Sequence, residues 1–381
     1  MSYPIPRRSA QAYEKHQNAP GQNQNPGLIF DRFSPDWGLD PLLKGDGLQA
    51  VKSASTRIDT ELLKAQLLRW SAAAAALGAR IFTFKTDWRL IAGFGRKGTL
   101  EVGFAFNRYG FPELPGSGLK GLARAWGRLA VAEALGTQDL TRLDKILSED
   151  DPEKFSDAWQ EAYPKATAEA LALANDFRIL FGTTACAGRA SFLSAVPDST
   201  HAPVLDADIL NPHYPKYYAG GGTYPIDGDS PIPVKFLTVA AGTQFWFAIA
   251  CRDASQLQPA EVLRLLNLAE KWLTLALQKL GAGAKTAGGY GFFDANQTGL
   301  SPLPEPPEYV IPQPDVIEVR QGVITGMRPD RRTGWLRDKD DATGEPKSFS
   351  IDVITPKGRT PGRGAVVTYT LTNGKITEVK V

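Results

Sequence analysis

Residues 281–293, with the sequence GAGAKTAGGYGFF, constrain the fold of this chain more than any other stretch. Five glycines and one lysine separate a long apolar helix pattern from a short aromatic run. Because glycine adopts positive φ and lets backbone approach a ligand closely, the N–H groups of Gly283 and Ala284 predict a cradle for an anion. Lys285 and Thr286 would add a charge and a hydroxyl. The alternative is a helix C-cap followed by a flexible turn.

The loop differs from a nucleotide-binding P-loop in two ways. A P-loop has glycine immediately before its lysine, and it follows a strand and precedes a helix. Here Ala284 precedes Lys285, and the helix comes first. This order is better suited to a phosphate chain that lies across a surface than to an enclosed triphosphate. Tyr290, in a strand predicted at residues 290–293, would stack on a base or close the sheet.

The chain has 381 residues, enough for two domains or for one large domain with an appendage. Its net charge of +2 is unevenly distributed. Residues 80–128 contain nine Lys or Arg against three Asp or Glu, residues 139–176 contain four against ten, and residues 317–381 contain twelve against eight. Separated basic and acidic segments predict one basic face for a polyanion.

The sequence gives little indication of a metal site, a disulfide framework or a membrane span. Cys186 and Cys251 lie far apart without CxxC spacing, which fits a reducing cytoplasm. No apolar run approaches a membrane span, and no signal peptide follows Arg7 and Arg8. Four aspartates lack the EF-hand spacing, so loop capping is favoured over a metal site. They are Asp206, Asp208, Asp227 and Asp229. We therefore expect a cytoplasmic protein without a cofactor.

The pattern predicts four regions along the chain. Residues 1–57 form an irregular arm, 58–296 a mixed α+β domain, 297–315 a Pro-rich linker, and 316–381 a small basic all-β domain. Helices are predicted at residues 58–77, 117–135 and 259–280, with an acidic helical insertion at 139–176. Strands are predicted at residues 81–91, 100–106, 177–181, 189–196 and 290–293, with a hairpin at 234–251. This order is that of a ferredoxin-like (RRM-like) fold, and the C-terminal domain suggests an OB-like barrel.

The segment GFPELPGSGLK at residues 110–120 marks a second candidate site. Ser117 can cap a helix that runs to about Leu135, and Gly116 and Ser117 would offer free N–H groups. Basic side chains recur every four residues and line one face of this helix, namely Lys120, Arg124 and Arg128. The pattern predicts a phosphate track, and the alternative is a solvated helix face.

Two further segments are candidate contacts. The basic turn GFGRKG at residues 93–98 contains Arg96 and Lys97. Residues 206–218, DADILNPHYPKYY, are predicted to form a loop that contacts nucleic acid or a neighbouring subunit, with His213 and Tyr214 in it.

Several motifs now resemble one family. GFPELPGSGLKGLARA at residues 110–125 is similar to the "G-x-P-x-x-P-G-S-S-L-K-G" signature of RAMP proteins, the RNA-binding subunits of CRISPR effectors, with Gly118 in place of the second serine. LNPHYPKYY at 210–218 and GAGAKTAGGYG at 281–291 resemble later signatures of one subgroup, and NPGLI at 25–29 resembles its N-terminal segment. Together they are similar to the sixth-named RAMP subunit family of type III-B (Cmr) effector complexes.

The resemblance implies a non-catalytic subunit that holds the crRNA guide near its 3′ end and supports target RNA recognition. The implied protein partners are the backbone RAMP subunits, the small helical subunit and the terminal RAMP subunit. In the backbone subunit that cuts target RNA, a catalytic aspartate follows the first strand, whereas residues 93–98 here contain no carboxylate. An RNA endonuclease using His213 or an aspartate, and a mainly structural subunit, remain alternatives.

The C-terminal domain loosely resembles a cold-shock domain, which stacks bases on aromatic side chains. Trp335 would do so here, with Phe349 and Tyr369 as possible helpers. A protein-docking barrel is the alternative.

Overall fold

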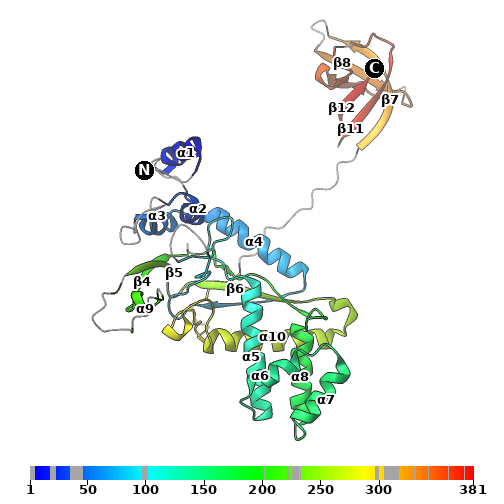
Figure 1. Cartoon of the computed structure of the whole chain (residues 1–381). Coiled ribbons are helices and arrows are strands. Elements are labelled where there is room, and N and C mark those ends of the chain that lie inside the picture. The colour runs from blue at the N-terminus through cyan, green and yellow to red at the C-terminus, as the bar shows by residue number, and fades with distance from the viewer. Residues whose placement is uncertain are drawn as a thin grey trace. The chain divides into compact units, whose positions relative to one another are not determined.

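The computed structural model describes residues 5–17, 23–34, 46–96, 102–200, 203–218, 220, 224, 231, 233–296, 300–303, 317–328, 332–341, 343–358, 360–372 and 374–381. The chain divides into two compact units, Met1–Pro306 and Pro307–Val381 (Figure 1). The first unit is α+β and the second consists mainly of strands.

The N-terminal region is more regular than the sequence predicts. It contains α1 (Arg7–Gln17), α2 (Pro26–Arg32) and α3 (Asp46–Ser55). The side chain of Asn25 caps α2 by accepting a hydrogen bond from the N–H of Leu28 at 2.9 Å. α3 buries Leu48, Val51 and Ala54, so this helix belongs to the core of the first unit.

A four-stranded antiparallel sheet forms the centre of the first unit. Strand β6 (Gln244–Cys251) pairs with β1 (Arg80–Lys85), β2 (Ala190–Phe192) and β3 (Val196–Pro197). Alternate side chains of β6 point to opposite faces, so Trp246 packs against Leu67 of α4 (Thr60–Ala76), while Phe247 joins the main core. Figure 1 shows α4 on one side of these strands and α5 and α10 on the other.

The three predicted long helices form where the sequence places them. They are α4, which Asp59 caps, α5 (Gly116–Leu135) and α10 (Pro259–Lys279). Trp272 of α10 is buried and stacks on Phe181 with ring centroids 5.8 Å apart. Gly127 lets α5 approach this tryptophan, since a Cβ there would lie 2.8 Å from the indole ring.

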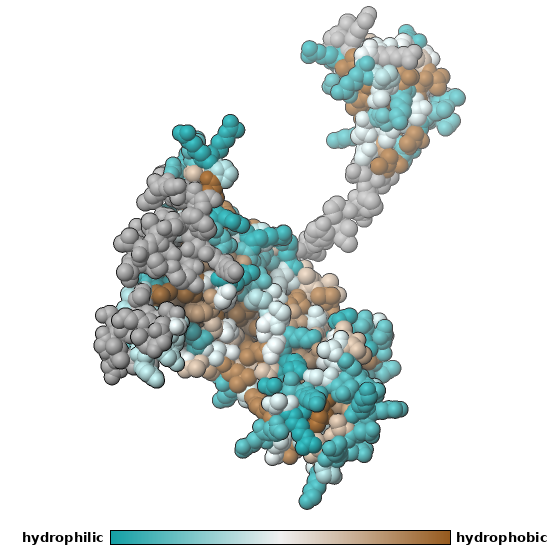
Figure 2. All heavy atoms as spheres, viewed as in Figure 1, coloured by the Kyte–Doolittle hydropathy of each residue, from teal (hydrophilic) through white to brown (hydrophobic). Residues whose placement is uncertain are grey.

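The acidic insertion is helical, as predicted. It consists of α6 (Leu140–Leu147), α7 (Pro152–Ala162) and α8 (Ala168–Phe181), and the face of it that Figure 2 shows is mostly hydrophilic. The predicted strand at residues 177–181 is wrong. These residues are the last turn of α8, where Phe177 and Phe181 contact Trp272.

The predicted hairpin at residues 234–251 is also wrong. Its two arms are β5 (Val234–Val239) and β6, which belong to different sheets. The turn at Ala241 and Gly242 lies where predicted, but β5 pairs with β4 (Leu205–Leu210). Residues 206–210, predicted as part of the 206–218 loop, therefore lie in strand β4, and the short helix α9 (Pro215–Tyr218) follows it.

Two further predicted strands are isolated bridges in the described part of the chain. Phe106 bridges Pro112, and Phe293 bridges Thr86. The strand predicted at residues 81–91 ends at Lys85. Two short 3₁₀ turns complete the unit, η2 (Ala254–Gln256) and η3 (Thr286–Gly288).

The second unit is a curled six-stranded sheet with the order β10-β12-β11-β7-β8-β9. Its strands are β7 (Ile317–Met327), β8 (Thr333–Asp338), β9 (Lys347–Ser350), β10 (Ile354–Thr355), β11 (Val366–Thr372) and β12 (Lys375–Lys380), with a 3₁₀ turn η4 (Ile351–Val353). Strands β11 and β12 form an antiparallel hairpin. Buried Tyr369 donates its hydroxyl hydrogen bond to Asp338 at 3.0 Å.

Candidate nucleic-acid interface

A hollow of about 350 Å³ lies at the N-terminus of α5. Its polar lining includes Ser117 and Lys120 on α5, Thr183 after α8, Ser191 on β2, and Arg252 after β6. The pKa of Lys120 is lowered, first by burial and then by the positive charges of Arg252 and Arg124. No Asp or Glu belongs to the described lining of the hollow, so its excess positive charge suits an anion.

The first turn of α5 is built differently from the sequence prediction. Pro115 is the N-cap residue and Ser117 makes no side-chain cap, so the predicted Ser117 cap is wrong. The N–H of Gly116 donates to Ser194 Oγ at 3.4 Å, and a Cβ on Gly116 would collide with the carbonyl oxygen of Phe192. Gly116 therefore serves close packing against the β2–β3 segment, whereas Ser117 is exposed.

The basic ridge of α5 is largely paired within the protein. Arg124 forms an ion pair with Asp144 of α6 at 3.0 Å and a hydrogen bond to Ser148 at 3.2 Å. Arg128 lies 3.7 Å from the same carboxylate. The acidic insertion thus neutralises the middle of the predicted phosphate track, and Lys120 is the ridge residue that faces the hollow.

In the glycine loop, several glycines serve the fold of the loop itself. Gly281 ends α10 with φ of 75°, and its N–H donates to Ala276 at 3.0 Å, as the C-cap alternative predicts. A Cβ on Gly283 or Gly291 would collide with the carbonyl oxygen of Ile91 or Ala282. The N–H of Ala284 donates to Ile91 at 2.9 Å, so the prediction of a free donor there is wrong.

Lys285 has the most unusual backbone of this loop. Its φ is 57°, a left-handed conformation that costs a non-glycine residue about 1–2 kcal/mol. Its ammonium lies 5.7 Å from the ring centroid of Phe94 and 5.9 Å from that of Phe236. Thr286 follows as the first residue of η3. Backbone strain of this kind concentrates at functional sites.

A network centred on Arg89 contacts the loop through Tyr290. Arg89 Nη1 is 2.6 Å from Asp208 Oδ2 and Nη2 is 2.8 Å from Asp206 Oδ2. Lys52 binds Asp206 at 2.8 Å, and the hydroxyl of Tyr290 donates to Asp208 at 2.7 Å. Burial and this hydrogen bond raise the pKa of Tyr290 to about 12. The hydroxyl of Tyr290 is therefore bound within the protein, and both aspartates are already paired with cations. Asp227 and Asp229 lie outside the described residues.

A ladder of backbone hydrogen bonds connects the two candidate motifs. The pairs, in order across the ladder, are Ala284 with Ile91 at 2.9 Å, Ala105 with Ala92 at 2.8 Å, Glu113 with Ala105 at 3.2 Å, and Leu114 with Ala195 at 3.2 and 2.9 Å. Lys285 follows the first residue of this ladder, and Gly116 comes two residues after Leu114. The helix start and the glycine loop therefore belong to one hydrogen-bonded layer.

The segment around Asn25 supports the 110–120 motif. A Cβ on Gly110, which has φ of 83°, would collide with Asn25 Oδ1. Gly27 also packs closely, since a Cβ there would lie 2.8 Å from Phe106 Cβ. The motifs at residues 25–29 and 110–120, which are far apart in the sequence, thus pack directly against each other.

The remaining predicted contacts are dispersed. Arg96 is exposed, and Lys97 lies outside the described residues. His213 is exposed with its ring 6.4 Å from that of Tyr214. Within the described part of the chain, no ion pair joins His213 to a carboxylate.

In the second unit, Trp335 lies on the sheet face opposite the core, because Leu336 is buried and a Cβ on Gly334 would meet the core side chain of Phe349. Gly326 is its cross-strand partner, with open space where a side chain would be, and Arg328 lies over the indole at 5.9 Å. Phe349 and Tyr369 are buried in the core, so the prediction that they help in stacking is wrong.

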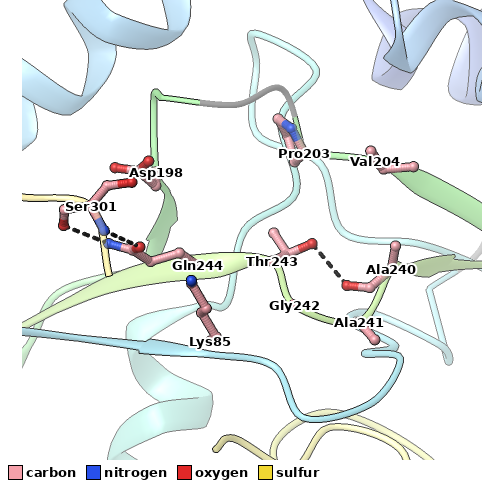
Figure 3. A pocket seen from close by; sticks show the side chains of 10 residues that line it. All are labelled: Lys85, Asp198, Pro203, Val204, Ala240, Ala241, Gly242, Thr243, Gln244 and Ser301. Carbon is pink, nitrogen blue, oxygen red and sulfur yellow. Dashed lines mark hydrogen bonds between the residues drawn. The ribbon is translucent and has the colours of Figure 1, made fainter. Parts of the chain in front are cut away.

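A smaller hollow of about 230 Å³ lies at the start of β6, lined by Lys85, Asp198 and Thr243 among others (Figure 3). At its edge the side chain of Gln244 exchanges two hydrogen bonds with the backbone of Ser301, at 3.0 and 2.8 Å. These two hydrogen bonds attach Ser301, in the predicted linker, to the first unit. Residues 304–316 lie outside the described residues.

Sequence reasoning missed Arg252, Arg89 and Trp88. Arg252 follows β6 without a motif, and its only signal is a positive charge at a strand end.

Among the described residues, no helix is long and apolar enough to cross a membrane, and no group of three His, Cys, Asp or Glu side chains is placed to hold a metal.

The family model of the RAMP superfamily matches residues 39–294, and the chain belongs to this superfamily. Over 231 residues, 55% of the chain, it is 32% identical to the CRISPR system Cmr subunit Cmr6 of Pyrococcus furiosus. The chain spans 65% of the length of that relative. The crystal structure of Cmr6 from Pyrococcus furiosus is similar with a TM-score of 0.37 and 28% identity, covering 56% of this chain and 97% of that one. A cryo-EM structure of the type III-B Cmr-beta complex bound to cognate target RNA contains a chain similar with a TM-score of 0.41 and 19% identity, covering 65% and 70%.

Proposed function

We propose that this chain is a non-catalytic RNA-binding subunit of a type III-B CRISPR effector, holding the crRNA guide near its 3′ end. Membership of the RAMP superfamily and the identity to a Cmr6 subunit support the assignment. The observation that carries it is the hollow at the start of α5, with Lys120 and Arg252 and without a carboxylate in its described lining. We further propose a ferredoxin-like core for the first unit and an OB-like barrel for the second.

In this proposal the phosphates of the RNA run between the hollow and the glycine loop, along the layer that joins them. Lys120, Arg252 and Lys285 neutralise phosphates, and Ser117 and Gly283 add backbone N–H groups. Because phosphates carry no sequence information, binding is tolerant of guide sequence and depends on salt. Trp335 of the second unit adds a stacking contact. Other effector subunits and target RNA complete the set of partners.

The test is a double variant, Lys120→Ala with Lys285→Ala, titrated with single-stranded RNAs of unrelated sequence at several salt concentrations. We expect weaker binding of all the RNAs alike. The slope of log affinity against log salt should fall by about 1.4, which corresponds to two lost contacts with a single strand. A matched control removes two exposed lysines elsewhere, Lys154→Ala with Lys271→Ala. Equal affinity of double variant and control would reject these assignments.

A ribonuclease is the second candidate function, with His213 as general base. Such a base needs a partner group and hydrogen-bond reach to a bound 2′-hydroxyl, and His213 has no carboxylate partner among the described residues. Incubation of the assembled complex with labelled guide and target RNA, with and without His213→Ala, separates the two functions. Loss of a cleavage product upon this substitution would overturn the non-catalytic assignment. A mainly structural subunit would instead give few RNA adducts upon crosslinking in the particle.

A further inference from the structure

The segment that follows β1 presents a large aromatic side chain to solvent. Trp88 is 51% exposed, although the backbone on both sides of it is fixed. Thr86 bridges Phe293, and Leu90 exchanges two backbone hydrogen bonds with Val239, at 3.0 and 2.8 Å. Because the backbone is already fixed, binding of a partner to this indole costs little conformational entropy.

The guanidinium of Arg89 holds this indole from one side. Its Cζ lies 5.5 Å from the ring centroid of Trp88, within the range of a cation–π contact. Arg89 is itself immobilised by the carboxylates of Asp206 and Asp208. The ring therefore has a defined orientation, and its exposed area is available to a second flat group.

The glycine loop lies directly beside this segment. The N–H of Asp87 donates to Phe292 at 2.9 Å, and the N–H of Gly291 donates to Arg89 at 2.8 Å. Three residues after Trp88, Ile91 accepts the hydrogen bond from Ala284, the neighbour of Lys285. A flat ring and a lysine-bearing loop thus occupy adjacent backbone segments, which matches the flat base and the anionic phosphate of one nucleotide.

The charged residues on either side of Trp88 argue against the buried centre of a protein interface. The residues before and after it in the chain, Asp87 and Arg89, are both charged, so this segment offers no continuous apolar patch. The fully buried centre of a protein interface is depleted of charged residues. A single indole supported by a guanidinium is instead typical of a base-stacking platform.

We propose that Trp88 stacks on a base of the single-stranded RNA whose phosphates contact Lys285. This inference rests on the proposed RNA-binding function, and it adds a stacking residue that lies in none of the sequence motifs.

The experiment compares the full-length parent, Trp88→Ala and Trp88→Phe in titrations with fluorescein-labelled single-stranded RNAs of about 20 nucleotides, at several salt concentrations. For Trp88→Ala we expect Kd to rise about tenfold, because one stacked base is lost. The salt slope should stay unchanged, because no charge is removed. Trp88→Phe keeps an aromatic face and should stay within about threefold of the parent. Leu263→Ala, which truncates another exposed apolar side chain, is the matched control.

The outcomes separate this inference from the function on which it rests. If the double lysine variant weakens binding while Trp88→Ala binds within twofold of the parent, the stacking role is overturned and the proposed function stands. If the parent binds none of the RNAs, both fail. If Trp88→Ala binds RNA normally but no longer enters the assembled particle, Trp88 contacts protein and the inference is overturned.

Discussion

Asp208 Oδ2 accepts hydrogen bonds from Arg89 Nη1 at 2.6 Å and from the Tyr290 hydroxyl at 2.7 Å. One carboxylate oxygen thereby ties the glycine loop to β4 and to the segment after β1. Since Asp206 binds both Arg89 and Lys52, the same network also includes α3. The shape of the candidate RNA surface depends on this network, whose members come from four separate parts of the chain.

The first prediction concerns acid stability. The hydrogen bond from Lys52 is the main cause that lowers the pKa of Asp206, and burial opposes it. For Asp208, burial raises the pKa, but hydrogen bonds from Tyr290, the Ile209 N–H and Arg89 outweigh it, so its pKa is also lowered. A folded pKa below the unfolded value of about 3.8 means that the stabilisation is present above that value and is lost as pH falls through the folded pKa.

The measurement is thermal unfolding of the parent and of Asp206→Asn with Asp208→Asn between pH 6 and pH 3. At pH 6 the double variant should be less stable by about 1–3 kcal/mol, because Arg89 and Lys52 lose their charged partners. The difference should shrink below about pH 4. Asp157→Asn, on an exposed position of α7, should follow the parent at every pH. A constant difference down to pH 3 would contradict the assignment.

The second prediction concerns Arg252, the cation of the hollow that no motif contains. Arg252→Ala should weaken binding of unrelated single-stranded RNAs to a similar extent and lower the salt slope by about 0.7, one phosphate contact. Fluorescence titration at four salt concentrations measures both quantities. Lys271→Ala removes one exposed charge from α10 as the control. If the two variants bind alike, RNA does not enter the hollow.

The third prediction concerns Trp335 in the second unit. Trp335→Ala in the full-length chain should raise the Kd for single-stranded RNA about five- to tenfold, because one stacked base is lost, and should leave the salt slope unchanged. Trp335→Phe should restore most of the affinity. The ring lies on the outer sheet face, so the unfolding temperature should change little. Unchanged affinity of Trp335→Ala would favour the protein-docking alternative.

The fourth prediction concerns the glycine that joins two motifs. Gly110→Ala should lower stability by roughly 2–4 kcal/mol, because the residue has positive φ and its Cβ would collide with Asn25 Oδ1. Gly118→Ala is the matched control, since a Cβ there meets nothing within 4 Å and alanine favours a helix. Chemical denaturation of both variants measures the difference. Similar stability of the two would show that the Asn25 contact does not hold the 110–120 motif.

The helices were predictable because their signals are local. Helices α4 and α10 begin and end within about two residues of the predicted limits, and α5 ends at Leu135 as expected. Residues 177–181 were misassigned because a short apolar run cannot distinguish a strand from a buried helical turn. The turn at Gly242 was visible in the sequence, but the pairing partner of β5 was not.

The sequence by itself determined the three long helices α4, α5 and α10, the all-β character of the C-terminal unit, and the two motifs that carry Lys120 and Lys285. Only the tertiary structure decided which charges remain for a ligand. Asp144 forms an ion pair with Arg124, and the carbonyl of Ile91 accepts the hydrogen bond from the N–H of Ala284. Arg252 and Lys120 line the same hollow. The physical reason is range, since a helix is set by neighbours within one turn, whereas an ion pair or a hollow depends on residues that only the folded chain brings together.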